Sequence, residues 1–190
     1  MPYTIYYHNK STRFWGRTLP IVLALETAGA EYTVKEPTDG MPEGVGFAVP
    51  VVTLACGHST SQMPVILDVL GERLGLGGST PEQKVRCKQL IMDMMDMSSE
   101  AIAGKFEKDK PARADKWLSY LEKKLAAHKF LVSDEPTVAD FVAMFALLWV
   151  DKLFEVPNAS TYPKITAYRA ACAELPAMKK IEASGVPALP

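Results

Sequence analysis

The sequence predicts an α/β domain over residues 1–77, with the element order βαβ-ββα, followed by an all-helical domain over residues 84–190. Two observations support this division. Short β-branched and aromatic runs occur only in the first part, whereas the rest of the chain shows the three-to-four-residue apolar spacing of helices. Residues 77–83 (GGSTPEQ) separate the two patterns. Because such a composition is typical of linkers, we expect the domain boundary there.

The chain opens with a predicted strand, helix and strand. Residues 3–7 (YTIYY) are β-branched and aromatic, as in a short buried strand. Residues 16–28 carry apolar residues at helical spacing, with Pro20 near the first turn and Gly29 at the end. Residues 31–36 predict the second strand. A helix between two strands favours parallel pairing.

A hairpin and a helix complete the predicted α/β domain. The run 47–55 is almost entirely apolar, and Cys56-Gly57-His58 turns it back into residues 59–61. Pro64 suits the first turn of the next helix, because proline lacks only an N–H that a helix leaves unpaired there.

The remainder of the chain predicts helices. Residues 81–106 form one long helical pattern and residues 112–127 a second, and we expect the two to pack antiparallel. Thr137 and Asp140 fit a capping box, which marks a helix start. Residues 141–154 are apolar almost all round, which predicts the buried centre of the domain. Shorter helices are expected at residues 163–173 and 177–183.

Composition narrows the class of protein. With 21 basic and 22 acidic residues the chain has a formal charge of -1, so we expect no nucleic-acid or membrane partner. The three cysteines are far apart and form no CxxC pair, which argues against a disulfide framework or a zinc site. The N-terminal residues lack the apolar segment of a secretory leader. These features predict a cytoplasmic protein with a small-molecule partner.

Four strings occur in a recognisable order: PYTIYY followed by GRTLPIVLALETAG, FAVPVVTLACGHSTSQ, SQMPVILDVLGERLGL, and HKFLVSDEPTVADFVAMF. Together they resemble, over nearly the whole chain, the soluble (cytosolic) glutathione S-transferase family, in particular its Tyr-type classes (sigma-, mu- or pi-like). The resemblance implies a thioredoxin-like N-terminal domain that binds glutathione and a helical C-terminal domain that contributes the electrophile site. It also implies a homodimer.

The resemblance places Tyr7 at the position of the catalytic tyrosine, which also contacts glutathione. Its hydroxyl would donate a hydrogen bond to the glutathione sulfur and so stabilise the thiolate, since a free cysteine thiol has a pKa of about 8.5. Ser11 and Thr12 are alternative donors, as in the serine-type classes. They lie in a loop that is about four residues longer than is usual in the family.

Further glutathione-binding residues follow from the same strings. The family's cis proline corresponds to Pro50, and the backbone of the preceding Val49 would pair with the cysteinyl part of glutathione. Gln62 would hold the γ-glutamyl end. Met63 stands where the family has serine, so only its backbone N–H can serve the carboxylate. Arg17 is placed near the glycyl carboxylate or the thiolate.

Acidic and aromatic residues complete the expected site. Asp93, Asp96 and Glu100 share one face of a predicted helix. In related classes an aspartate on this helix reaches across the dimer to the γ-glutamyl amine, a role that Asp96 fits. Sigma-class prostaglandin isomerases bind a divalent cation there, and a solvated helix face is the remaining interpretation. Phe14 and Trp15 could form an aromatic wall for a hydrophobic substrate.

The predicted function is therefore conjugation of glutathione, as a thiolate, to a hydrophobic electrophile. Glutathione is the expected co-substrate and no metal is expected. Two alternatives remain at this stage: a non-catalytic binding or scaffold protein of the same fold, and a specialised glutathione-dependent isomerase similar to prostaglandin D synthase.

Overall fold

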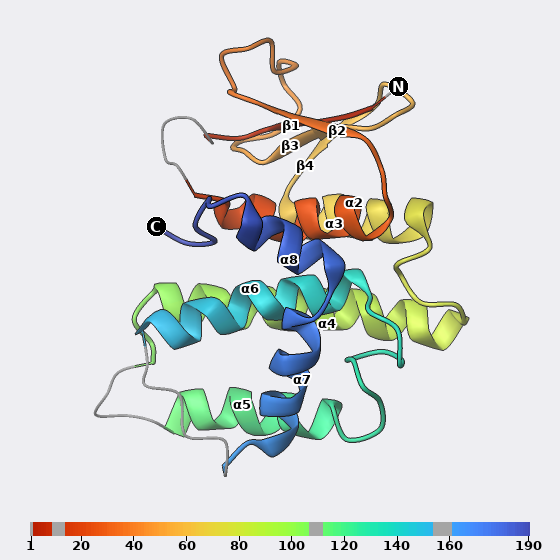
Figure 1. The fold of residues 1–190 in the computed structure, drawn as a ribbon. Coiled ribbons are helices and arrows are strands. Elements are labelled where there is room, and N and C mark those ends of the chain that lie inside the picture. The colour runs from red at the N-terminus through yellow and green to blue at the C-terminus, as the bar shows by residue number, and fades with distance from the viewer. Residues whose placement is uncertain (1, 9–13, 107–111, 154–160) are drawn as a thin grey trace.

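A computed structural model describes residues 2–8, 14–106, 112–153 and 161–190. Its first part contains a four-stranded sheet with the order β2-β1-β3-β4 (Figure 1). The strands are β1 (Tyr3–Tyr6), β2 (Tyr32–Lys35), β3 (Val51–Thr53) and β4 (Ser59–Ser61). β1 pairs in parallel with β2 and antiparallel with β3, and β3 pairs antiparallel with β4. The expected parallel pair and the hairpin are both present.

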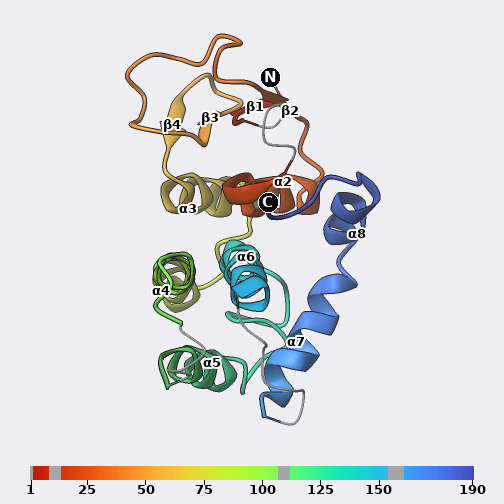
Figure 2. The same cartoon turned by 90° about the vertical axis from the view of Figure 1, so that its left-hand side faces the viewer.

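Helices α2 (Leu19–Thr27) and α3 (Met63–Leu74) lie side by side on one face of the sheet. A short 3-10 turn, η1 (Gly16–Thr18), leads into α2. The second part of the chain packs against the other side of these two helices (Figure 2). Because α2 is covered on both sides, its residues from Leu19 to Leu25 are all buried.

The second part of the chain is helical, as the sequence predicts. Its elements are α4 (Pro81–Ile102), α5 (Ala112–Lys124), α6 (Val138–Leu153), α7 (Pro163–Ala173) and α8 (Pro176–Ala183). α4 and α5 run antiparallel: Arg86 near the start of α4 donates to the carbonyl of Lys124 at the end of α5, at 3.0 Å, and Arg113 near the start of α5 pairs with Glu100 near the end of α4. The predicted fold class, α/β followed by all-α, is confirmed.

Two boundaries differ from the predicted ones for identifiable reasons. The apolar run 47–55 contributes only the strand Val51–Thr53, because Pro50 has no N–H for a sheet ladder. α4 ends at Ile102 rather than at residue 106, and Gly104 just beyond it has a φ of 73°, the left-handed conformation that stops helices. The domain boundary itself stays a prediction, since one apolar core extends through both parts of the chain.

Asp140 anchors the start of the central helix α6. Its carboxylate is fully buried and accepts hydrogen bonds from the N–H of Leu131 at 2.9 Å, the N–H of Thr137 at 2.8 Å and the hydroxyl of Thr137 at 2.9 Å. Tyr168 of α7 donates to the Asp140 carbonyl at 3.1 Å. Burial raises the pKa of Asp140, while the hydrogen bonds oppose that rise. The Asp140 carboxylate therefore joins the 131–137 loop to the start of α6.

Among the described helices, none combines the length and the apolar character needed to cross a lipid bilayer.

We expect Asp140→Ala to lower the free energy of unfolding by about 3 kcal/mol, because it leaves the buried N–H groups of Leu131 and Thr137 without an acceptor. Urea denaturation measures the loss. Glu135→Ala is the matched control, since it removes an exposed carboxylate from the same loop. Similar, small losses in both variants would contradict the anchoring role.

Candidate functional site

Strand register brings three of the predicted site residues to one edge of the sheet. Tyr6 lies opposite Val51 in β3, and Val51 lies opposite Ser61 in β4. The next residue beyond this row is Tyr7 after β1, Pro50 before β3 and Gln62 after β4. The N–H of Tyr7 bonds to the carbonyl of Lys35 at 3.0 Å, which continues the β1–β2 pairing by one residue. Tyr7 is therefore held at the same edge as Pro50 and Gln62.

The Tyr7 hydroxyl lies against the start of η1. The backbone N–H of Arg17 donates to the hydroxyl oxygen at 3.3 Å, which leaves the hydroxyl hydrogen free to donate elsewhere. The Arg17 side chain is exposed and has no ion pair within the described part of the chain. Tyr7 itself is half-buried. Because its hydrogen is not used, the Tyr7 hydroxyl can donate to an anion that approaches this edge of the sheet.

Gly16 permits this close approach. A Cβ atom at position 16 would lie 2.5 Å from the Tyr7 hydroxyl oxygen and 2.8 Å from a ring carbon of Phe14. Gly16 also has a φ of 52°, a conformation that side chains rarely tolerate. The sequence pattern Gly-Arg at the start of this helix is thus explained by contact with the predicted catalytic residue.

Val49 and Pro50 are joined by a cis peptide bond, as the family resemblance implies. Pro50 is buried and Val49 is half-buried. Both precede Val51, where β3 begins, so the backbone of Val49 lies beyond the sheet ladder.

Gln62 and Met63 begin α3. Gln62 has a φ of 68°, and it is the single non-glycine residue with a positive φ in the described ranges. Such conformations cost about 1 to 3 kcal/mol and concentrate at functional sites. The first N–H groups of a helix have no partner within the helix, and its dipole favours an anion there. The Gln62 side chain is exposed and caps no backbone group of α3.

The Met63 side chain does not face this edge. It is 1% exposed and packs in the apolar core, so only the backbone of Met63 can contribute to a ligand site. The sequence could not show this direction, because it depends on the backbone angles of Gln62.

The three acidic residues on α4 have different surroundings. Arg113 donates to Glu100 at 2.7 Å and lowers the pKa of that carboxyl to about 2, and Trp117 donates to it at 3.0 Å. Tyr120 donates to Asp93. Asp96 is exposed and has no side-chain partner in the ranges that the structure covers. Within those ranges no three His, Cys, Asp or Glu side chains are arranged to hold a metal ion.

Phe14 and Trp15 lie in two different environments. Phe14 is half-buried beside Gly16, close to the Tyr7 hydroxyl. Trp15 is only 7% exposed and packs in the core, and its part in a substrate wall stays a prediction. The alternative donors Ser11 and Thr12 lie outside the described residues.

One contributor to the site has no sequence signal. Residues 186–188 (VPA) lie beside η1, where the carbonyls of Pro187 and Ala188 accept hydrogen bonds from the N–H groups of Trp15 and Gly16, each at 2.8 Å. Sequence periodicity cannot reveal this, because the segment is short and irregular.

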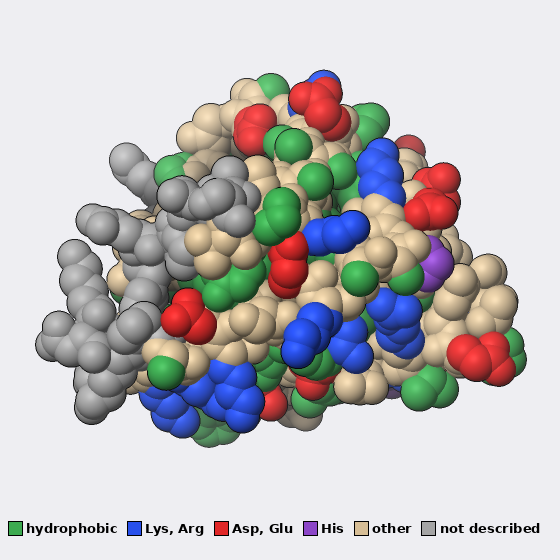
Figure 3. All heavy atoms as spheres, turned by 90° about the horizontal axis from the view of Figure 1, so that it is seen from below, with side chains coloured by type: hydrophobic (Ala, Val, Ile, Leu, Met, Phe, Trp, Pro, Cys, Tyr) green, Lys and Arg blue, Asp and Glu red, His purple; other side chains and the backbone are tan. Residues whose placement is uncertain are grey.

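One cavity of the molecule lies away from the predicted site residues. A cavity of about 150 Å³ between α6, α7 and α8 is lined by Tyr168 and Cys172 among others, and contains none of the predicted site residues. The face seen in Figure 3 mixes acidic, basic and apolar side chains.

Comparisons with known proteins bear on the family and the fold. The family model for the C-terminal domain of glutathione S-transferase matches residues 91–176. A Dictyostelium discoideum protein provisionally named glutathione S-transferase alpha-5 is 25% identical over 168 residues, covering 82% of this chain and 84% of its own.

Solved structures share the fold of the whole chain. The crystal structure of the glutathione S-transferase from Ascaris lumbricoides has a TM-score of 0.78 at 23% identity, over 97% of each chain. A Sulfitobacter glutathione transferase homologue, solved with bound glutathione, has a TM-score of 0.73 at 15% identity, over 97% of this chain and 99% of its own. The chain is therefore similar to glutathione S-transferases in its matched helical domain, in the Dictyostelium relative and in the fold that it shares with the solved structures.

Proposed function

We propose that the protein is a Tyr-type glutathione transferase that activates glutathione as a thiolate and adds it to a hydrophobic electrophile. The observation that carries the proposal is the Tyr7 hydroxyl, which accepts the Arg17 N–H at 3.3 Å at the edge shared with Pro50 and Gln62. The Sulfitobacter homologue with the same fold holds glutathione.

Thiolate stabilisation follows from this arrangement. The Tyr7 hydroxyl donates to the glutathione sulfur, which favours the anion over the neutral thiol. The N–H of Arg17 donates to the same hydroxyl oxygen, and a hydroxyl that accepts one hydrogen bond becomes a better donor in the next. The thiol proton passes to solvent. The sulfur then forms a bond to the electrophilic carbon while that carbon releases its leaving group with the bonding electrons.

The rest of glutathione is held mainly by backbone groups and charges. The backbone of Val49 pairs with the cysteinyl part, and the start of α3 at Gln62 and Met63 receives the γ-glutamyl carboxylate. The exposed guanidinium of Arg17 pairs with the glycyl carboxylate. The electrophile binds beside Phe14, and the helical domain, residues 84–190, contributes to its site. A cytoplasmic location stays a prediction.

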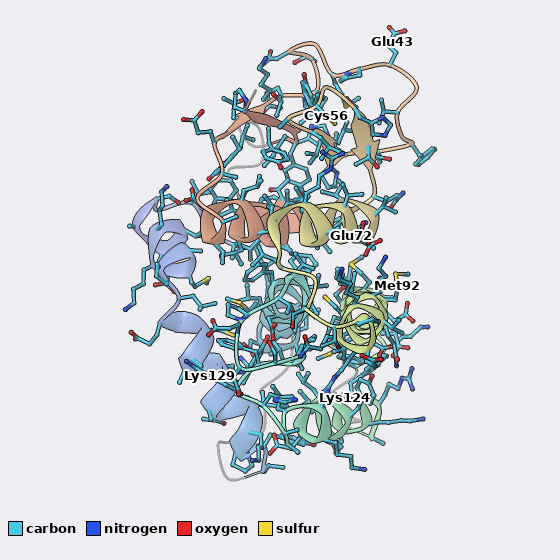
Figure 4. The ribbon with its side chains drawn as sticks, turned by 90° about the vertical axis from the view of Figure 1, so that its right-hand side faces the viewer. Glu43, Cys56, Glu72, Met92, Lys124 and Lys129 are labelled. Atoms are coloured by element: carbon cyan, nitrogen blue, oxygen red, sulfur yellow. The ribbon has the colours of Figure 1, made fainter. Side chains whose placement is uncertain are left out.

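A homodimer is the second part of the proposal. Phe47, Val85 and Met92 are large apolar side chains that are more than half exposed. Val85 and Met92 are seven residues apart, and Asp96 is four residues further, so all three lie on one exposed face of α4. Met92 projects from the outer side of this helix (Figure 4). Pairing through this face brings Asp96 towards the second copy, where it can meet the γ-glutamyl amine.

Tyr7→Phe tests thiolate stabilisation. We expect kcat/KM with glutathione and an aryl halide to fall about 100-fold, the size of effect seen when a preorganised donor is removed. The dissociation constant of glutathione should change little. Tyr6→Phe is the control, because strand alternation directs Tyr6 to the opposite face of the sheet. If Ser11→Ala abolishes activity while Tyr7→Phe keeps it, the tyrosine is not the donor. If the wild-type protein binds glutathione but shows no turnover, it is a binding protein.

Met63→Ser tests whether glutathione relies on the backbone of α3. Because the methionine side chain is buried, we expect the free energy of unfolding to drop by about 3 kcal/mol. Calorimetric titration should show unchanged affinity for glutathione, since the new hydroxyl lies in the core. Val65→Ser, at an exposed position in the same turn, is the control for stability. A clear gain in affinity in Met63→Ser would show that position 63 does face the ligand.

Met92→Glu tests the dimer. Two copies of the new carboxylate on a shared face repel each other, so we expect the dimer to dissociate to monomers in light scattering. Ile102→Glu, at an exposed position on a different side of α4, should remain dimeric. A wild-type protein that is monomeric under the same conditions refutes the dimer proposal.

A further inference from the structure

Residues 186–188 supply hydrogen-bond acceptors at the start of η1. The N–H groups at the start of a helix have no intrahelical partner and are usually satisfied by a side chain. Trp15, at the N-cap of η1, makes no side-chain cap bond. Instead, the carbonyl of Pro187 accepts the Trp15 N–H and the carbonyl of Ala188 accepts the Gly16 N–H, both at 2.8 Å. The chain's last residues run beside the start of α2 in both ribbon views (Figures 1 and 2).

Trp15 and Gly16, which make these two hydrogen bonds, lie next to the groups that contact the Tyr7 hydroxyl. Gly16 sits against the Tyr7 hydroxyl, and the next residue, Arg17, donates its N–H to that hydroxyl. The φ of 52° at Gly16 is one of many conformations that glycine can adopt, so the local sequence alone does not select it. Two hydrogen bonds from a distant segment hold Trp15 and Gly16, the two residues that precede the Arg17 N–H.

The 186–188 segment is itself held in place. Val186 and Ala188, together with Leu189, pack against the apolar core. The preceding helix α8 is tied to the sheet part through Lys180, whose ammonium group lies 2.6 Å from the carboxylate of Glu26 in α2. Tyr32 of β2 donates to the same carboxylate at 2.7 Å. The segment can therefore act as a fixed support for η1.

We propose that residues 186–188 are a positioning element for the reaction: their carbonyls hold Trp15 and Gly16 so that the Arg17 N–H fixes the hydroxyl of Tyr7. This inference rests on the proposed function. It assigns a role in thiolate formation to a segment that need not touch glutathione. Loss of the segment leaves the Tyr7 hydroxyl present but free to rotate, so thiolate stabilisation weakens.

The test compares a chain ended after Gly185 with a control ended after Leu189, which keeps both carbonyls and the packed leucine. For the shorter chain, we expect the pH profile of kcat/KM for the electrophile, measured at saturating glutathione, to show a thiol pKa of bound glutathione higher by about one pH unit. At neutral pH kcat should fall about tenfold, with little change in the KM for glutathione. The control should keep the wild-type profile.

Two further variants separate positioning from general destabilisation. In a Tyr7→Phe background, ending the chain after Gly185 should not raise the thiol pKa further, because the hydroxyl it positions is gone. Leu189→Asp keeps the chain length while weakening the packing of the segment, and replaces the shorter chain if that chain does not fold. A lower melting temperature with an unchanged thiol pKa overturns the inference.

Amide hydrogen exchange distinguishes this inference from the proposed function. In the shorter chain the N–H groups of Trp15, Gly16 and Arg17 should exchange faster than in the control, whatever the activity. If the wild-type protein does not conjugate glutathione, the proposed function fails, and with it the role in thiolate formation. Unchanged exchange at these three N–H groups, or wild-type activity and pH profile in the shorter chain, overturns the positioning role alone.

Discussion

The antiparallel pairing of β1 with β3 is the constraint on which the candidate site depends. It sets Tyr6 opposite Val51, and the β3–β4 hairpin sets Val51 opposite Ser61. Side chains alternate along a strand, so a slip of one residue would turn the Tyr7 side chain to the other face of the sheet. The Tyr7 hydroxyl would then point away from the helix starts that follow β1 and β4. A few backbone hydrogen bonds in very short strands thus determine where the Tyr7 hydroxyl lies.

Much of the fold could be predicted because its signals are local. Proline, glycine and apolar spacing mark the helix from Leu19 and the central helix from Val138, and both form close to the expected residues. Tyr7, in contrast, is singled out by the family resemblance and not by a local pattern. Side-chain direction was harder to predict: Trp15 and Phe14 are neighbours, yet one is buried in the core and the other lies beside the hydroxyl. That difference depends on the turn at Gly16 and on contacts with residues 187 and 188, which no local pattern contains.

The acidic residues of α4 are a second case in which the sequence does not show the surroundings of a side chain. The spacing of Asp93, Asp96 and Glu100 correctly predicts a shared helix face, but the sequence does not show which carboxylates already have partners. In the structure Tyr120 and Arg113, both on α5, satisfy the first and the last of the three. Asp96 is exposed and has no side-chain partner among the described residues. The packing of a second helix therefore decides which acid is available to a ligand.

The burial of α2 between the sheet and α6 has a consequence for folding. One continuous apolar core includes side chains from the sheet, from α2 and from the helical part. The N–H of Val138 also bonds to the carbonyl of Leu76 at 2.9 Å, which ties the start of α6 to the end of the first part. Unfolding of either part exposes the apolar side of the other, so the two should melt together in one cooperative transition. A fragment comprising residues 1–77 would present the uncovered face of α2 to water and would tend to aggregate.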